Sequence, residues 1–339
     1  MNLIDSVVQC RTPFLVRDPA SGAVVALNNA ADCAERVAHC PLRYVLTDEL
    51  VHLCADLAYP TGARVGPCAD LLRAPAESLW VEWRHEPWQR AVQHFGSLRI
   101  PAESPAAERY GIWARSSPDG RRGVLRTFWR ATAHDVLASS VEAYFDLDTA
   151  AGEEPEPLDG AAGSCVRLDD KEPRDEDVLA RCFRFRYERS WEQYYASAAL
   201  THEQRFNLWR HAVRTIAMDV PMLLAFFLLL ATRNGLPQRA QTFERLNRRR
   251  LRGGKAPLLE HIEVRVPMLP GHPQVPRGEP QSTRMSPRLH HVRGHLVRRG
   301  SQIFWRVPHL RGSARAGIVR TRTVVWSIDR GAGAARESG

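Results

Sequence analysis

Two histidines and an arginine near the carboxyl end have the side-chain types that metal-independent RNA cleavage uses. His291, Arg293 and His295 alternate along one extended segment, so they project from the same side of a strand. Imidazoles titrate near neutral pH and can act as general acid and general base, and a guanidinium can stabilise a charged phosphorane. The pattern therefore allows a metal-independent ribonuclease, with His309 as a reserve residue.

An antiparallel hairpin is the element that must position these residues. Residues 290–299 alternate as a strand, and a two-residue loop at Gly300 and Ser301 pairs Leu296 with Trp305. A slip of one residue would move Trp305 to the charged face, so the apolar pairing supports this register. The opposite, water-facing side is then expected to hold His291, Arg293, His295 and Arg306.

A short arginine-rich helix precedes the hairpin. Thr242 is its expected N-cap, and Gly253-Gly254 is its expected end. Like charges at this density repel one another, and a bound anion would reduce this repulsion. Together with the hairpin, the helix supplies the predicted phosphate-binding set: Arg248, Arg249, Arg250, Arg252, Lys255, Arg293, Arg298, Arg299 and Arg306.

The charge is distributed unevenly along the 339 residues. The chain has 47 Lys and Arg against 38 Asp and Glu, a net charge of +9 and a pI near 9.6. Residues 241–339 alone hold 20 Lys and Arg against 6 Asp and Glu, or +14, which leaves −5 for residues 1–240. The last hundred residues therefore carry the basic character, and a polyanion is the partner it favours.

Several other classes of function find no support in the sequence. The seven cysteines include no C-x-x-C pair, which argues against a zinc ribbon or a redox dithiol, and a reducing cytoplasm is expected. Dinucleotide, kinase and Ser-His-Asp spacings are missing, and we expect no cofactor and no metal. The apolar run at residues 220–231 is shorter than the roughly 20 residues of a membrane-spanning helix, so we expect no membrane contact.

The composition predicts an α+β protein with five segments. The N-terminal part is mixed, with helices at residues 31–39 and 48–58 and strands at 79–83, 110–115, 123–129 and 141–147. A helical hairpin is expected in the middle and an antiparallel sheet with a basic helix at the end. The predicted divisions are an α+β domain at 1–147, an acidic Pro- and Gly-rich linker or excursion at 148–177, a helical core segment at 178–240, the basic helix and strands at 241–329 and a disordered tail at 330–339.

The helical hairpin is predicted from capping and periodicity. Thr201 and Gln204 match a capping box, and an apolar stripe follows from Phe206 to Val220 at helical spacing. Pro221 should end or kink this helix before a second apolar helix begins. Both helices are expected in the core.

Short motifs at both ends resemble those of an uncharacterised family of phage and prophage proteins. The resemblance implies a phage or prophage setting in a bacterial cell and supplies no catalytic residue. The motifs are Trp80-Val81-Glu82-Trp83, Asn247-Arg248-Arg249-Arg250 with Gly254-Lys255-Ala256-Pro257-Leu258, Arg288-Leu289-His290 with Arg293-Gly294-His295, and His309-Leu310-Arg311-Gly312.

The leading hypothesis is a protein that binds nucleic acid through the phosphates, using its basic C-terminal module. One alternative is the ribonuclease described above. Another is a structural or protein-interaction protein whose basic surface has no ligand, and an acidic protein surface is a further possible partner. The acidic segment 148–177 would make binding conditional if it folded over the basic face.

Overall fold

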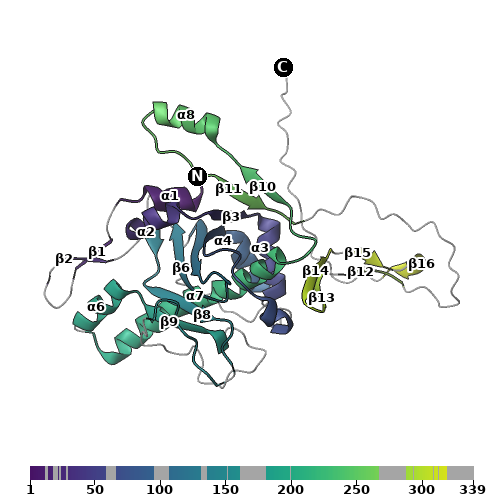
Figure 1. The fold of residues 1–339 in the computed structure, drawn as a ribbon, viewed down its shortest axis with the longest axis horizontal. Helices are drawn as coiled ribbons and strands as arrows, with labels where there is room; N and C mark the ends of the chain where they lie inside the picture. Colours follow the sequence, from purple (N-terminus) through teal and green to yellow (C-terminus); the bar gives the residue numbers. More distant parts are fainter. Residues whose placement is uncertain are drawn as a thin grey trace, which may run out of the picture. The chain divides into compact units, whose positions relative to one another are not determined.

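The computed structural model confirms the α+β class and places most of the chain around one mixed sheet (Figure 1). The structure describes residues 1–11, 14–17, 22, 24–27, 30–58, 66–94, 107–130, 136–150, 152–160, 181–198, 200–266, 288–292, 294–307, 309–311 and 313–318. They fall into two units, a larger one of residues 1–267 and 296–305 and a smaller one of residues 268–295 and 306–339.

The described residues of the larger unit form a sheet of nine strands, and β3, β4 and β11 run parallel within it. The remaining neighbours pair antiparallel, and β7 pairs with β6 beside the main path. In spatial order the strands are β10 (Gln238–Gln241), β11 (His261–Val264), β3 (Leu42–Leu46), β4 (Ser78–Arg84), β5 (Arg109–Ser116), β6 (Arg122–Arg130), β8 (Val141–Asp146) and β9 (Phe183–Tyr187), with β7 at Val136–Ala138.

Helices cover both faces of this sheet. One face packs against α1 (Leu3–Gln9) and α2 (Ala30–Ala38) around Trp80, Trp113 and Phe128. On the other side α3 (Asp48–Ala58) packs against α4 (His85–His94) and α7 (His202–Leu230), and the ring of Phe226 meets Tyr44 of β3 edge-on at 5.4 Å. Strand β4 is consequently buried on both sides, as its nearly continuous apolar sequence requires.

Smaller elements complete the larger unit. They are the hairpin β1 (Phe14–Arg17) and β2 (Val24–Leu27), the 3-10 helix η1 (Gly66–Leu71), helices α6 (Arg189–Ser197) and α8 (Glu244–Arg252), and the hairpin β13 (His295–Arg299) and β14 (Gln302–Arg306). The smaller unit contains β12 (Arg288–Val292), which pairs antiparallel with β15 (His309–Arg311) and parallel with β16 (Ser313–Ile318).

The predicted helical hairpin is wrong, because α7 runs without a break through Pro221. Its capping box at Thr201 and Gln204 is present as expected. A proline inside a helix costs about 3 kcal/mol. Neighbours such as Val220 and Met222 are fully buried, and each buried side chain contributes roughly 1.5–3 kcal/mol, so packing outweighs the local cost. Phe206, expected in the core, is 45% exposed because the first turns of α7 are exposed.

Helix α7 is long and apolar enough to cross a membrane by length and composition, and 76% of its most apolar stretch is buried within the structure. A helix in a protein core shows burial of this kind.

The predicted basic module of residues 241–329 does not form one unit. Strand β11 pairs in parallel with β3, so β10 and β11 are strands of the large sheet, and α8, which connects them, belongs to the larger unit. Residues 319–329 of the predicted C-terminal strands lie outside the described residues, as does the tail at 330–339.

Candidate nucleic-acid interface

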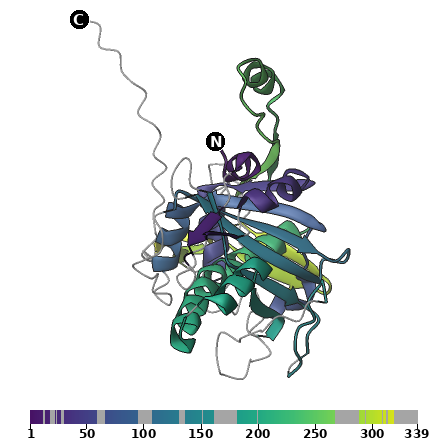
Figure 2. The same ribbon diagram turned by 90° about the vertical axis from the view of Figure 1, so that its left-hand side faces the viewer.

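The most basic element in the described structure is an arm that projects from the edge of the large sheet. We call residues 242–260, with α8 at their tip, the α8 arm. Gln241 at the end of β10 lies opposite His261 at the start of β11, so the arm leaves and re-enters the sheet at one place. Helix α8 has no buried residue, and both ribbon views show it apart from the other helices (Figures 1 and 2).

Side-chain hydrogen bonds hold the arm in shape. The Asn247 Oδ1 accepts the backbone N–H of Leu258 at 2.8 Å, and its Nδ2 donates to the Leu258 carbonyl at 2.9 Å. The Arg250 Nε donates to the Ala256 carbonyl at 2.8 Å. Gly254, at φ +68°, lets the chain turn back after the helix. The helix is thus tied to the returning segment, although a helix of this length is marginal alone.

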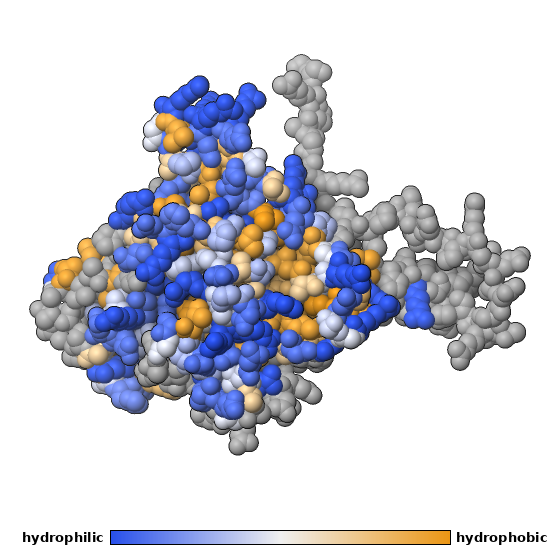
Figure 3. All heavy atoms as spheres, in the orientation of Figure 1, coloured by the Kyte–Doolittle hydropathy of each residue, from blue (hydrophilic) through white to orange (hydrophobic). Residues whose placement is uncertain are grey.

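Four arginines form a stripe on the side of α8 that faces away from this clamp. Arg245, Arg248, Arg249 and Arg252 stand at positions i, i+3, i+4 and i+7, within about 100° of helix circumference, whereas Asn247 lies about 150° from the centre of the stripe. All four are exposed. We call them the arginine stripe. Figure 3 shows a hydrophilic cap with a small apolar spot over α8.

Charge on the stripe is not compensated by described carboxylates. Elsewhere, arginines pair closely with acids: Arg84 lies 2.8 Å from Asp48, and Arg184 lies 2.7 Å from Glu154. No stripe arginine has a carboxylate oxygen of the described residues within the 4.0 Å ion-pair limit. Within the described part of the chain, the stripe is therefore open to an external anion.

The structure changes the predicted phosphate-binding set in two places on α8. Arg250 uses its guanidinium to hold the arm, which makes it a positioning residue, and Arg245 joins the stripe in its place. Thr242 is not the N-cap: the cap is Phe243, which makes no side-chain capping bond. Lys255 is exposed in the loop after the helix.

The hairpin β13–β14 forms with its loop at Gly300 and Ser301 as predicted but does not supply a basic sheet face. Gly300, at φ +60°, occupies the first loop position, and Trp305 is 2% exposed on the apolar side. Arg298, however, makes a two-pronged ion pair with Asp70 at 2.7 Å, so its charge is neutralised. The guanidinium of Arg299 lies over the Phe304 ring at 5.8 Å. Arg306 is exposed at the end of β14.

The single strand expected over residues 290–299 is not formed. Strand β12 ends at Val292 and pairs with β15 and β16, whereas β13 begins at His295 and pairs with β14. His291 and His295 are consequently on strands of different sheets, and His295 is half-buried. Arg293 and the side chain of His291 lie outside the described residues. The ribonuclease hypothesis therefore loses the alternation on which it depended.

Acidic side chains in the described part of the segment form ion pairs with arginines of the large sheet. Glu154 pairs with Arg184, Glu156 with Arg122 at 2.7 Å, and Asp159 with Arg186. These pairs lie on β6 and β9 rather than on the α8 arm. Masking of the arm is thus unsupported for residues 148–150 and 152–160, and residues 161–180 lie outside the description.

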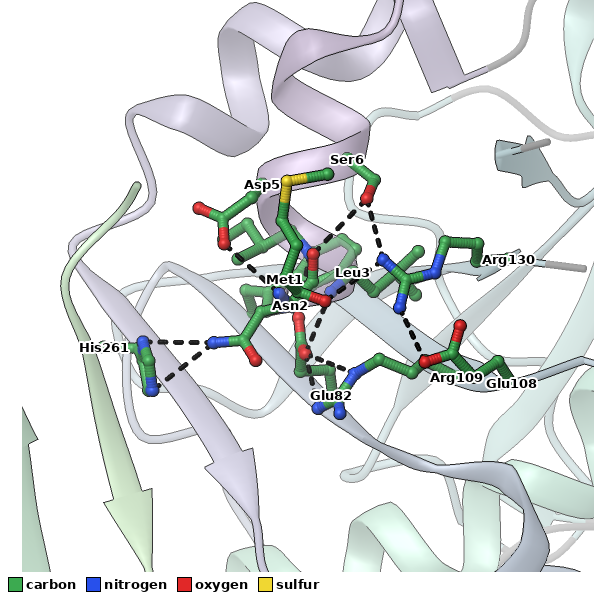
Figure 4. Close-up of polar contacts among 12 residues, drawn as sticks. Met1, Asn2, Leu3, Asp5, Ser6, Glu82, Glu108, Arg109, Arg130 and His261 are labelled. Atoms are coloured by element: carbon green, nitrogen blue, oxygen red, sulfur yellow. Dashed lines mark hydrogen bonds and ion pairs between the residues drawn. The ribbon is translucent and has the colours of Figure 1, made fainter. Parts of the chain in front are cut away.

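Sequence reasoning missed a buried polar network beside the base of the arm (Figure 4). Glu82 is fully buried, and its carboxylate accepts the backbone N–H groups of Leu3 and Ile4 at 3.1 and 2.8 Å and the Trp80 indole N–H at 3.0 Å. Arg109 pairs with it at 2.7 Å. This network fixes the start of α1 to the sheet. A lone glutamate between two tryptophans in an apolar strand was the available signal.

A hollow of about 600 Å³ lies next to this network. Its walls come from α1, the end of β3, the start of α3, strands β4, β5, β10 and β11, and the base of the arm. Its two arginines, Arg84 and Arg109, are paired with Asp48 and Glu82, and burial raises the pKa of Asp5. Within the described residues no group of three or more His, Cys, Asp or Glu side chains could hold a metal ion.

Comparison with known proteins gives no match to a protein family, to a curated protein or to a solved structure.

Proposed function

We propose that this protein binds nucleic acid through its phosphates, with the arginine stripe of the α8 arm as the contact surface. The observation that carries the proposal is the placement of four exposed arginines on one side of a projecting helix, without a described carboxylate in ion-pair range. Arginine presents a planar fork of donors that suits phosphate oxygens. The Asn247 clamp holds the stripe in place before a ligand arrives, which lowers the entropy cost of binding.

Binding of this kind depends steeply on salt. Each phosphate contact on duplex DNA contributes about −0.9 to the slope of log K against log salt concentration. Four phosphate contacts from the stripe give a slope of about −3.6 and two give about −1.8, so a fourfold rise in salt should weaken binding roughly 150-fold or roughly 12-fold. The phage or prophage setting stays a proposal that rests on the sequence resemblance.

The test measures binding of the full chain to labelled duplex DNA, single-stranded DNA and duplex RNA at 50 and 200 mM salt. We expect salt-sensitive binding by the natural chain and its loss when all four stripe arginines become glutamine. A matched control replaces four other exposed arginines, Arg36, Arg73, Arg205 and Arg214, with glutamine, so the net charge falls equally. Failure of the natural chain to bind any nucleic acid at 50 mM salt, or an equal loss in the control, overturns the proposal.

A protein with an acidic surface is the second candidate partner. Leu246 and Leu251 are 45% and 59% exposed on α8, which favours an apolar contribution to the contact. Replacing both leucines with serine separates the two functions. A nucleic-acid contact keeps its salt slope in this variant, whereas a contact that depends on apolar burial weakens at every salt concentration.

A further inference from the structure

The shape of the α8 arm specifies a narrower ligand class than nucleic acid in general. The arm is convex, with a helix of nine residues at its tip. Such a helix is about 13 Å long and, with side chains, about 10–12 Å across. The major groove of B-form DNA is about 12 Å wide and 8.5 Å deep and admits an α-helix, whereas the major groove of an RNA duplex is deep and narrow.

The tip of the arm lacks the aromatic side chains that single-strand binding requires. Proteins that hold single strands combine a basic groove with aromatic side chains on which bases stack. No aromatic residue occurs from Glu244 to Leu258. Phe243, at the base, is half-buried, and its ring lies 5.5 Å from that of His261. The arm therefore offers guanidinium groups on a protruding surface and no stacking platform.

The order of the arginines around the helix suits a groove with two phosphate walls. Arg248 and Arg249 occupy the two edges of the stripe, about 100° apart, and Arg245 and Arg252 lie between them. A helix that enters a groove with its stripe leading directs the edge residues toward the two backbones and the central pair toward the base edges. Arginine binds the O6 and N7 atoms of guanine with two hydrogen bonds, which is a frequent specific contact in the major groove.

We infer that the α8 arm enters the major groove of duplex DNA, with Arg248 and Arg249 on phosphates and Arg245 and Arg252 toward the edges of guanine bases. The inference rests on the proposed nucleic-acid binding and names its substrate. It also separates two roles within one stripe, because a phosphate contact tolerates lysine as a point charge and a two-pronged guanine contact does not.

The first experiment compares the affinity of the full chain for duplex DNA, single-stranded DNA and duplex RNA of one G-containing sequence at 100 mM salt. We expect duplex DNA to bind at least about tenfold more tightly than either other ligand. Methylation of guanine N7, which lies in the major groove, should interfere with binding, and the minor-groove ligand netropsin should leave it unchanged.

The second experiment uses charge-conserving variants. Changing Arg245 and Arg252 to lysine should weaken binding to G-containing duplex DNA at least about tenfold and leave the salt slope unchanged. The matched pair, Arg248→Lys with Arg249→Lys, should weaken binding by about threefold only, because lysine keeps the charge at each phosphate and loses only the planar fork.

The outcomes separate the two proposals. Absence of binding to every nucleic acid overturns the proposed function and with it the inference. Binding that depends on the stripe, but that is as tight for single strands or duplex RNA, is insensitive to N7 methylation or is displaced by netropsin, leaves the function standing and overturns the major-groove inference. Equal losses in the two lysine pairs overturn the division of roles.

Discussion

Removing the Asn247 clamp tests whether the arm must be held in shape in order to bind. In the Asn247→Ala variant both hydrogen bonds to Leu258 disappear, while every charge in the arm is kept. Each bond contributes about 1 kcal/mol net, so the clamped arm loses about 2 kcal/mol relative to open forms. This shifts the equilibrium between clamped and open arms roughly 30-fold, and an arm that is marginally stable alone then spends much of its time open.

We expect the affinity of this variant for duplex DNA to fall by up to about 30-fold, with the salt slope unchanged. Fluorescence anisotropy across a salt series measures both quantities, and amide hydrogen exchange over residues 248–252 reports the opening of the helix directly. A suitable control is Asn207→Ala on the exposed start of α7, which keeps the same chemistry away from the arm. Faster exchange in the arm with affinity within twofold of the natural chain refutes the reasoning, because charge alone would then suffice.

Three further predictions concern the framework that carries the arm. Glu82→Ala should lower the free energy of unfolding by about 3–5 kcal/mol, because it leaves Arg109 without its buried partner. The substitution Glu86→Ala, at an exposed glutamate, should lower it by under about 1 kcal/mol. Urea titration of both variants measures these changes, and equal effects would contradict the prediction. Burial lowers the pKa of His85 to about 4. The unfolded chain therefore takes up a proton first as the pH falls below about 6.5, and the stability of the folded protein decreases between pH 6.5 and 4. Between pH 7.5 and 5 the free energy of unfolding of the natural chain should fall by about 2 kcal/mol more than that of His85→Gln, and parallel pH profiles would exclude this role. Burial raises the pKa of Asp219 well above its usual value, and its Oδ2 has no hydrogen-bond partner among the described residues, so ionisation is penalised as the pH rises. Asp219→Asn should therefore stabilise the protein, more at pH 8 than at pH 5, and a thermal melt with no gain at pH 8 would count against this prediction.

Features set by neighbouring residues could be predicted from the sequence. Helices at residues 31–39 and 48–58 follow from their apolar spacing and correspond to α2 and α3. The capping box at Thr201 forms because its partners are three residues apart. The turn at Gly300 needs a positive φ, which glycine adopts at little cost. In each case the physical determinant lies within a few residues of the element it fixes.

The candidate site was predicted in composition but not in arrangement. The density of arginine between residues 245 and 252 is visible in the sequence, and helical spacing alone gives the stripe. What the sequence does not reveal is which arginines remain available. Arg298 is neutralised by Asp70, which is 228 residues away in the chain, and Arg250 is used to hold the Ala256 carbonyl.

Tertiary packing decided the remaining features. Strand β11 pairs with β3 from the far end of the chain, which makes the basic helix an arm of the large sheet rather than part of a separate module. Pro221 stays inside α7 because the burial of its neighbours outweighs the lost backbone hydrogen bond. The segment at residues 290–299 divides between two sheets, because strand partners are chosen by long-range pairing that the alternation of side chains does not encode. Helices, turns and the location of charge follow from the sequence alone, since these depend on local backbone energetics and composition. Only the folded chain decided which charges meet a partner and which stay open to solvent, since that depends on residues brought together from distant positions.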